Sequence, residues 1–191
     1  MQSRYILLLL NGAILSVCAV FVDTERKLLL TSLLLILPLL DKHYRQVELT
    51  LNKTNLYQWL ITGCFIALLL LTNPEQLNSI AILVFFVALP EEWFFRRYFQ
   101  QNLYEYFKRN KLSDYSVPRN LAIFSTSLFF ALMHLPTQGY IGLTVFLPSL
   151  VLGYVYQMKQ DLIFVILLHS LFNLFFIAYL QDFLQDFLQH I

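Results

Sequence analysis

Apolar residues along the chain fall into seven runs separated by short polar segments. A helix needs about 20 apolar residues to cross the hydrocarbon core of a bilayer, with roughly 17 to 25 as the working range. By that rule the pattern predicts membrane-spanning helices at about 5–22, 28–40, 56–72, 77–97, 119–135, 139–158 and 161–180. The second run is too short on its own, so it either borrows flanking residues or enters the membrane only part of the way.

Two further segments have the pattern of amphipathic helices. The fourth run continues through "YFQQNLYEYFKRN", whose tyrosines and phenylalanines suit a membrane interface. The segment 181–191, "QDFLQDFLQHI", repeats a four-residue unit, which places Phe183, Leu184, Phe187 and Leu188 on one helical face. We expect this amphipathic tail to lie along the membrane surface.

The composition is that of a membrane protein. Of the 191 residues, 58% are hydrophobic and only 13% are charged, with a mean hydropathy of +0.62, whereas soluble domains carry about 25% charged residues. We expect an all-α membrane protein, a polytopic bundle of about seven transmembrane helices forming one membrane domain over 1–191. The net charge of +1 and the scattered basic clusters argue against nucleic acid as a partner and leave membrane lipids as the surroundings.

The first apolar run and the cysteines add two smaller expectations. Arg4 followed by apolar residues resembles a secretory signal, but the run is longer than a signal core and no small-x-small cleavage site follows, so we expect a retained first span. Cys18 and Cys64 lie inside apolar runs, where we expect small buried hydrophobes rather than disulfide partners.

Lysine and arginine placement predicts the orientation, because cytoplasmic loops hold the excess of these residues. With seven spans, two basic residues, Arg26 and Lys27, lie on one side and eleven on the other. The eleven are Arg4, Lys42, Arg45, Lys53, Arg96, Arg97, Lys108, Arg109, Lys111, Arg119 and Lys159. If 28–40 does not span, the division becomes twelve against one. In either case we expect a multi-pass protein of the cell membrane with residues 98–119 in the cytoplasm.

Seven polar side chains lie where the pattern predicts hydrocarbon, at a cost of about 2.5–3.5 kcal/mol for an ionisable group on insertion scales, so each is a functional candidate. They are Glu91, Glu92, Arg96, Arg97, His134, His169 and Asn173.

The charged residues of this set belong to "ALPEEWFFRRYFQ". Glu92 and Arg96 are four residues apart, so they share a helical face and can form an ion pair. Glu91 points about 100° away and has no such partner, which leaves it free to transfer a proton. Pro90 either begins a helical segment or kinks a continuing helix. The alternative interpretation is a juxtamembrane charge cluster that only anchors the helix.

The histidines occur in two short motifs on later runs. In "FFALMH" Phe130 precedes His134 by four residues, and in "HSLFN" His169 precedes Asn173 by four, so each pair shares a helical face. A single histidine in a span is more often a packed, hydrogen-bonded residue, and a single asparagine more often joins helices. Together with the glutamates, however, these residues could activate a water molecule and stabilise an oxyanion.

The three motifs and their order resemble those of the CAAX protease and bacteriocin-processing (Abi) family of intramembrane endopeptidases. "EEWFFR" fits Glu-Glu-x-x-x-Arg, "FALMH" fits Phe-x-x-x-His and "HSLFN" fits His-x-x-x-Asn. The resemblance covers residues 77–180, the expected catalytic core, and not the N-terminal spans within 1–76. Arg97 stands where the family often has glycine, and eukaryotic members have more spans; both departures bear on the substrate class.

The resemblance implies a role for each residue. Glu91 is the general base that activates water together with His134, and His169 and Asn173 donate hydrogen bonds to the oxyanion. Arg96 holds Glu92 in register, and Phe130 packs beside the site. The expected partner is a protein or peptide substrate with a membrane-embedded segment, which must unwind locally because helical backbone groups are otherwise bonded to one another.

Metal dependence is open at this stage. A zinc ion could be held by Glu91, His134 and His169, but the His-Glu-x-x-His spacing of zinc proteases is absent. We favour catalysis without a cofactor, with zinc as the alternative. Two other functions compete: a non-catalytic immunity or partner-binding protein of the same family, and a small transporter, which the lack of an internal repeat disfavours.

The spacing also predicts the depth of the site. Glu91 lies 17 residues before Lys108, and His134 lies 15 residues after Arg119. At about 1.5 Å per residue both are roughly 22–26 Å from the basic loop. We therefore expect the cluster in the outer half of the bilayer, which suits exported peptides with leader segments or proteins with C-terminal sorting signals, and prenylated C-termini less well.

Overall fold

The computed structural model describes residues 2–20, 27–41, 56–74, 80, 82–110 and 116–180, and the regular structure in these residues is entirely helical. Where the predicted apolar runs are described they lie on helices, so the all-α prediction is confirmed; the tail 181–191 lies outside the described residues. The elements are α1 (Gln2–Val20), α2 (Lys27–Ile36), η2 (Leu37–Leu40), α3 (Leu56–Thr72), η6 (Leu83–Ala88), α5 (Leu89–Glu92), η7 (Trp93–Gln100), α6 (Gln101–Arg109), α7 (Ser116–Gln138), η8 (Gly139–Val145), α8 (Phe146–Lys159), α9 (Leu162–Phe175) and η9 (Phe176–Leu180).

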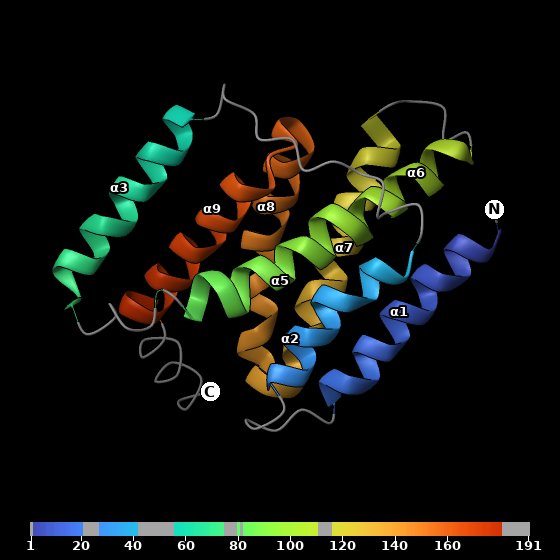
Figure 1. Cartoon of the computed structure of the whole chain (residues 1–191), viewed down its shortest axis with the longest axis horizontal. Coiled ribbons are helices and arrows are strands. Elements are labelled where there is room, and N and C mark those ends of the chain that lie inside the picture. Colours follow the sequence, from blue (N-terminus) through green and yellow to red (C-terminus); the bar gives the residue numbers. More distant parts are fainter. Residues whose placement is uncertain are drawn as a thin grey trace.

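One long helix crosses the centre of the molecule (Figure 1). It consists of η6, α5, η7 and α6, and the residues at their junctions all have right-handed helical backbone angles. The segments η6 and η7 are wide π-helical turns, a form found mainly as local bulges at functional sites. The prediction that the fourth apolar run continues as a helix through residue 109 is confirmed.

Pro90 lies inside this continuing helix, directly after η6. A proline has no N–H, so it cannot bond the carbonyl four residues earlier, which is that of Phe86. The Thr31 hydroxyl of α2 donates to the Phe86 carbonyl oxygen instead, at 3.2 Å. A neighbouring helix thus supplies a side-chain donor to a backbone carbonyl in the turn before the proline.

The helices α7 and α8 form an antiparallel hairpin. Gly139 begins η8 with φ +59°, a left-handed conformation that suits glycine. Gly142 then packs so closely on α7 that a Cβ there would lie 2.8 Å from the backbone C and O of His134. Further along, the Tyr154 hydroxyl donates to Asn120 Oδ1 at 3.2 Å. The turn therefore depends on glycine at the point where it passes His134.

On one side of the bundle, α3 lies beside α9 at the edge of the molecule (Figure 1). Trp59 Nε1 donates to Asp161 Oδ2 at 2.8 Å, and Asp161 Oδ1 caps α9 by accepting the Phe164 N–H. At the other end, Asn73 Nδ2 donates to the Tyr179 hydroxyl at 3.2 Å. The two helices therefore run parallel and are joined by hydrogen bonds near both ends.

On the opposite side, α1 and α2 cover the central helix. Asn11 of α1 is buried and donates to the Tyr98 hydroxyl at 3.0 Å and to the Leu37 carbonyl at 3.4 Å. Tyr98 and Tyr104 are themselves buried. Two of the three tyrosines of the amphipathic segment thus also pack into the bundle, which the sequence pattern did not indicate, whereas Tyr106 is exposed.

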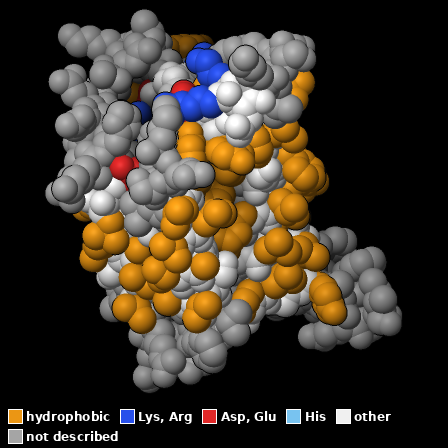
Figure 2. Space-filling model, turned by 90° about the vertical axis from the view of Figure 1, so that its right-hand side faces the viewer, with side chains coloured by type: hydrophobic (Ala, Val, Ile, Leu, Met, Phe, Trp, Pro, Cys, Tyr) orange, Lys and Arg blue, Asp and Glu red, His pale blue; other side chains and the backbone are white. Residues whose placement is uncertain are grey.

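The outer surface is rich in exposed hydrophobic side chains. Figure 2 shows lysine and arginine side chains gathered at one end of a face whose remainder is largely hydrophobic. By length and composition, two helical stretches in the described residues could cross a membrane, Ser116–Lys159 and Leu162–Leu180, and the first of these contains the α7–α8 hairpin. Shorter apolar helices lie at Leu8–Cys18, Leu29–Leu40 and Leu56–Thr72. The count of seven spans stays a prediction.

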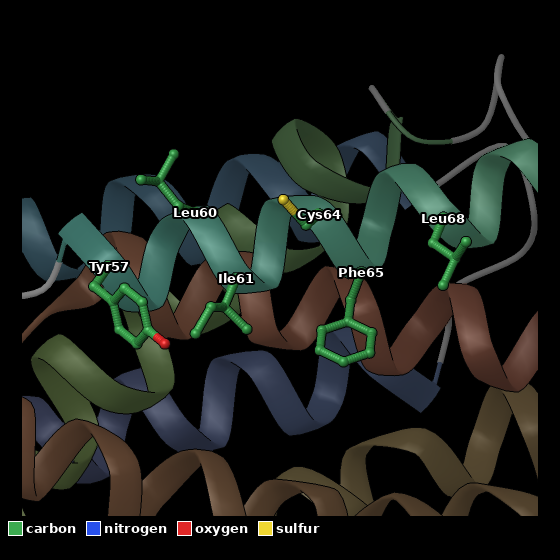
Figure 3. Close-up of a pocket in the computed structure, with 6 residues that line it drawn as sticks. All are labelled: Tyr57, Leu60, Ile61, Cys64, Phe65 and Leu68. Atoms are coloured by element: carbon green, nitrogen blue, oxygen red, sulfur yellow. The ribbon is translucent and has the colours of Figure 1, made fainter.

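The cysteine expectation holds only in part. Both cysteines are free thiols, but neither is buried: Cys18 is half-buried and Cys64 is exposed. Cys64 is exposed because α3 lies at the edge of the bundle and turns an apolar face outward. A cavity of about 430 Å³ follows this face (Figure 3). It is lined by Tyr57, Leu60, Ile61, Cys64, Phe65 and Leu68.

The close contact at Gly142 generates a prediction about stability. We expect Gly142→Ala to lower the free energy of unfolding by about 1–3 kcal/mol, because the added methyl group collides with the backbone at His134. Gly63→Ala is the matched control, since a Cβ at this helical glycine meets nothing within 4 Å, and it should be neutral or stabilising by up to about 1 kcal/mol. Thermal unfolding in detergent micelles compares the two; equal melting temperatures would contradict the tight turn.

Candidate active site

The three sequence motifs meet where the central helix passes α7 and α9. Glu91 and Glu92 lie on α5, and Arg96 follows one turn later on η7. Phe130 and His134 come from α7, and His169 and Asn173 from α9. The structure therefore brings together residues from three helices that are far apart in the sequence, at a buried position.

Glu92 is the most connected residue of the cluster. Its Oε2 accepts a hydrogen bond from Arg96 Nε at 3.0 Å, and both side chains are fully buried. Its Oε1 accepts one from His169 Nδ1 at 2.7 Å. The predicted pair of Glu92 and Arg96 is confirmed, whereas the contact between Glu92 and His169 was not predicted.

Glu91 lies beside this pair with a different environment. Its side chain is 18% exposed, and Oε2 is 3.6 Å from His169 Nε2. That oxygen is buried and makes no hydrogen bond within the described part of the chain. His134 is also within electrostatic range of the Glu91 carboxylate. Of the two adjacent glutamates, only Glu91 keeps an oxygen that is not already bonded by the protein.

The hydrogen bonds of the two histidines constrain their protonation. His134 Nδ1 lies 2.8 Å from the Phe130 carbonyl oxygen, and because a carbonyl only accepts, this nitrogen carries the hydrogen. His169 Nδ1 likewise donates to Glu92. In both residues Nε2 is therefore the nitrogen left for chemistry, and an outer hydrogen bond fixes the orientation of each ring.

Phe130 fills the space between these groups. Its ring is buried, with its centroid 4.5 Å from that of His134 and 6.1 Å from that of His169. The guanidinium carbon of Arg96 is 5.8 Å from the same ring centroid. Phe130 therefore packs against both histidines and the arginine at once, which limits the space available to water.

Asn173 is partly buried on α9, one turn after His169 on the same helical face. Its side chain makes no hydrogen bond to any other residue that the structure describes. Arg97, the second arginine of the motif, is half-buried and donates to the Tyr156 hydroxyl of α8 at 3.5 Å. Asn173 thus borders the cluster, whereas Arg97 contacts a different helix.

A second set of polar residues, on η7 and α8, supports Arg96. Arg96 NH2 donates to Ser149 Oγ at 2.7 Å, and NH1 donates to Gln100 Oε1 at 3.5 Å. Gln100 Nε2 in turn donates to the Gly153 carbonyl at 3.0 Å. Sequence reasoning missed both partners, although the four-residue spacing of Arg96 and Gln100 could have indicated that pair.

The donor set bears on metal binding. In the part of the chain that the structure describes, no three His, Cys, Asp or Glu side chains are grouped as a metal ion would require. Within the cluster, Glu92 accepts hydrogen bonds from Arg96 Nε and from His169 Nδ1, so these atoms are already engaged by the protein. The apolar cavity along α3 is lined by none of the cluster residues.

Comparison with known proteins gives one match. The family model described as type II CAAX prenyl endopeptidase Rce1-like matches residues 73–175, more than half of the 191-residue chain, and this range contains all three motifs. Neither a curated protein nor a solved structure matches. The family consists of membrane-embedded CAAX-type proteases with protein or peptide substrates. The resemblance found in the motifs is confirmed, and the chain belongs to the Rce1-like family of type II CAAX prenyl endopeptidases.

Proposed function

We propose that this protein is an intramembrane endopeptidase in which Glu91 and His134 activate water, and His169 and Asn173 stabilise the oxyanion. One observation carries the proposal: Glu91 has a buried carboxylate oxygen next to His169, and no residue that the structure describes donates a hydrogen bond to it. The adjacent Glu92 has both oxygens engaged by Arg96 and His169. The adjacent acids are thereby divided into one that is available for proton transfer and one that is structural.

In the first step, Glu91 takes a proton from water while the water oxygen attacks the scissile carbonyl carbon. His134 orients this water through Nε2, since its Nδ1 hydrogen is held by the Phe130 carbonyl. The carbonyl oxygen becomes an oxyanion in the tetrahedral intermediate. When the C–N bond breaks, Glu91 returns the proton to the leaving amine, and the products are a carboxylic acid and an amine.

The oxyanion needs hydrogen-bond donors at the moment it forms. The Asn173 amide can donate directly, and its side chain has no hydrogen-bond partner to give up among the described residues. His169 can donate from Nε2 when it is protonated on both nitrogens, and the Glu92 carboxylate on Nδ1 stabilises that imidazolium, as the aspartate does in serine protease triads.

The mechanism that we propose uses no metal ion. Glu92 is occupied by Arg96 and His169, so among the described residues of the cluster Glu91 and the Nε2 atoms of the two histidines remain as strong ligands. Because His169 serves the oxyanion in this mechanism, Glu91 and His134 are left, fewer than the three protein ligands of a catalytic zinc site.

We further propose a multi-pass arrangement in the cell membrane with residues 98–119 in the cytoplasm and the cluster in the outer half of the bilayer. The continuous helix from Glu91 to Arg109 supports a long separation between the site and the basic end of α6. A site at that depth suits a membrane-associated or exported protein or peptide as the substrate.

Activity measurements test the roles. In proteoliposomes with a cleavable membrane peptide, Glu91→Gln, His134→Ala and His169→Ala should abolish cleavage, and Asn173→Ala should lower kcat about 100- to 1000-fold, as loss of one oxyanion donor does. Dialysis against a strong chelator should leave the wild-type rate unchanged. Wild-type rates from His134→Ala would refute the assignment, and activity restored only by zinc would replace it with a metal-dependent one.

A stability comparison separates catalysis from a purely structural network. Glu92→Gln removes the charge on which Arg96 and His169 depend, so it should lower the free energy of unfolding by about 3–5 kcal/mol. Glu91→Gln, at the neighbouring position, should leave the melting temperature close to that of the wild type. Equal destabilisation by both changes would favour the non-catalytic alternative.

Cysteine labelling on intact cells tests the orientation. With Cys18 and Cys64 replaced by alanine, single cysteines at the exposed positions Thr137 and Gln138 should react with an impermeant thiol reagent. A cysteine at Lys108, also exposed, should react only after the cells are opened. An inverted pattern would place the site on the cytoplasmic side and contradict the exported substrate.

A further inference from the structure

We infer that Ser149 of α8 is a positioning residue of this protease, because it determines how Arg96 holds Glu92 and hence how Glu92 holds His169. The inference rests on the proposed function, in which His169 is an oxyanion donor. None of the three family motifs contains Ser149, which lies inside an apolar run.

The contact is short and fully enclosed. Arg96 NH2 donates to Ser149 Oγ at 2.7 Å, and both residues have 0% exposure. Ser149 therefore bonds to an arginine that is buried and ion-paired. Hydrogen bonds to charged groups are stronger than those between neutral groups, so this contact should hold the arginine firmly.

The geometry of arginine gives this bond its consequence. Nε and NH2 lie on the same edge of the planar guanidinium, and a carboxylate commonly occupies both in a bidentate pair. Here Glu92 Oε2 accepts from Nε, whereas NH2 donates to Ser149 Oγ and not to Glu92. Glu92 Oε1 is thereby left for His169 Nδ1, which it accepts at 2.7 Å.

The helix that carries Ser149, α8, makes further contacts around the Arg96 guanidinium. Gln100, which contacts Arg96 NH1, is held by the carbonyl of Gly153, four residues after Ser149. A Cβ at Gly153 would lie 3.0 Å from Gln100 Oε1 and 3.6 Å from Arg96 NH1. One face of α8 thus approaches the guanidinium closely and bonds to it both directly and through Gln100.

Without the Ser149 hydroxyl, Arg96 NH2 loses its partner. We expect NH2 to turn to Glu92 Oε1, because Glu92 already accepts from the adjacent Nε. The monodentate pair then becomes bidentate and the acceptor is withdrawn from His169 Nδ1. His169 then loses the hydrogen bond that orients its ring, while Glu91 and His134 stay unchanged.

The test uses Ser149→Ala with a matched control, Ser127→Ala. Ser127 lies on α7, the other helix of the hairpin; it is also 0% exposed, but its hydroxyl makes no hydrogen bond in the described residues. Ser149→Thr restores a hydroxyl. Ser149→Cys, of similar size and with a weaker acceptor, replaces the alanine variant if that protein does not fold.

The first readout needs no substrate. In full-length protein with ¹⁵N-labelled histidine, the Nδ1 proton of His169, assigned by its loss in His169→Ala, should be strongly downfield in the wild type, Ser127→Ala and Ser149→Thr. It should move upfield or disappear in Ser149→Ala. An unchanged signal in Ser149→Ala would overturn the inference whatever the activity of the protein.

The second readout is steady-state kinetics on the cleavable membrane peptide. Ser149→Ala should lower kcat about 10-fold with little change in KM, as loss of an outer-shell partner does, and Ser127→Ala should not. A wild-type kcat in folded Ser149→Ala would overturn this inference and leave the proposed function standing. Full activity of Glu91→Gln would instead overturn the proposed function, and the His169 resonance would then decide whether Ser149 positions His169.

Discussion

The interior of this protein is organised around one buried carboxylate. A charged group removed from water is stable only when it is paired and its remaining acceptor positions are bonded. Glu92 satisfies both conditions with Arg96 from its own helix and His169 from α9, and Ser149 extends the pairing to α8. Three helices are thus held at fixed rotations by contacts that water cannot replace, and the other residues of the site take their positions from them.

The central helix has an unusual form at this carboxylate. The four α-helical residues Leu89–Glu92 lie between the wide turns of η6 and η7, and the Trp93 N–H is shared by the carbonyls of Leu89 and Pro90. A widened turn rotates everything that follows it relative to a regular helix. This rotation helps to explain why the adjacent glutamates differ so much in their surroundings. Glu92 is enclosed, whereas Glu91 has a carboxylate oxygen with no hydrogen-bond partner among the described residues.

The parts of the site that could be predicted are those set by local helical geometry. The four-residue spacing gave the ion pair of Glu92 with Arg96 and the contact of Phe130 with His134, and both are present. The hydrophobic pattern likewise located the helices, because lipid and core both require long apolar runs. A contact between residues four positions apart can be predicted without knowing where any other helix lies.

What could not be predicted depends on how each helix is rotated against its neighbours. The bond from His169 to Glu92 joins residues 77 positions apart, and the wide turns of η6 and η7 invalidate a regular helical wheel. Ser149 gave no signal, because a lone serine in an apolar run is ordinary. Cys64 was expected inside, but only the position of α3 at the edge of the bundle decides that it is exposed.

The hydrogen bond from Thr31 to the Phe86 carbonyl joins the N-terminal helices to the region that the family model matches. The region that is recognisable as a protease begins at residue 73, yet a helix from outside that region completes the backbone of the helix that carries both glutamates. Asn11, also outside that region, donates to the side-chain hydroxyl of Tyr98 on the same helix. A fragment that began at residue 73 would keep every motif but would lose the Thr31 donor to the Phe86 carbonyl. The segment that the family model matches is therefore shorter than the segment that folds as a unit.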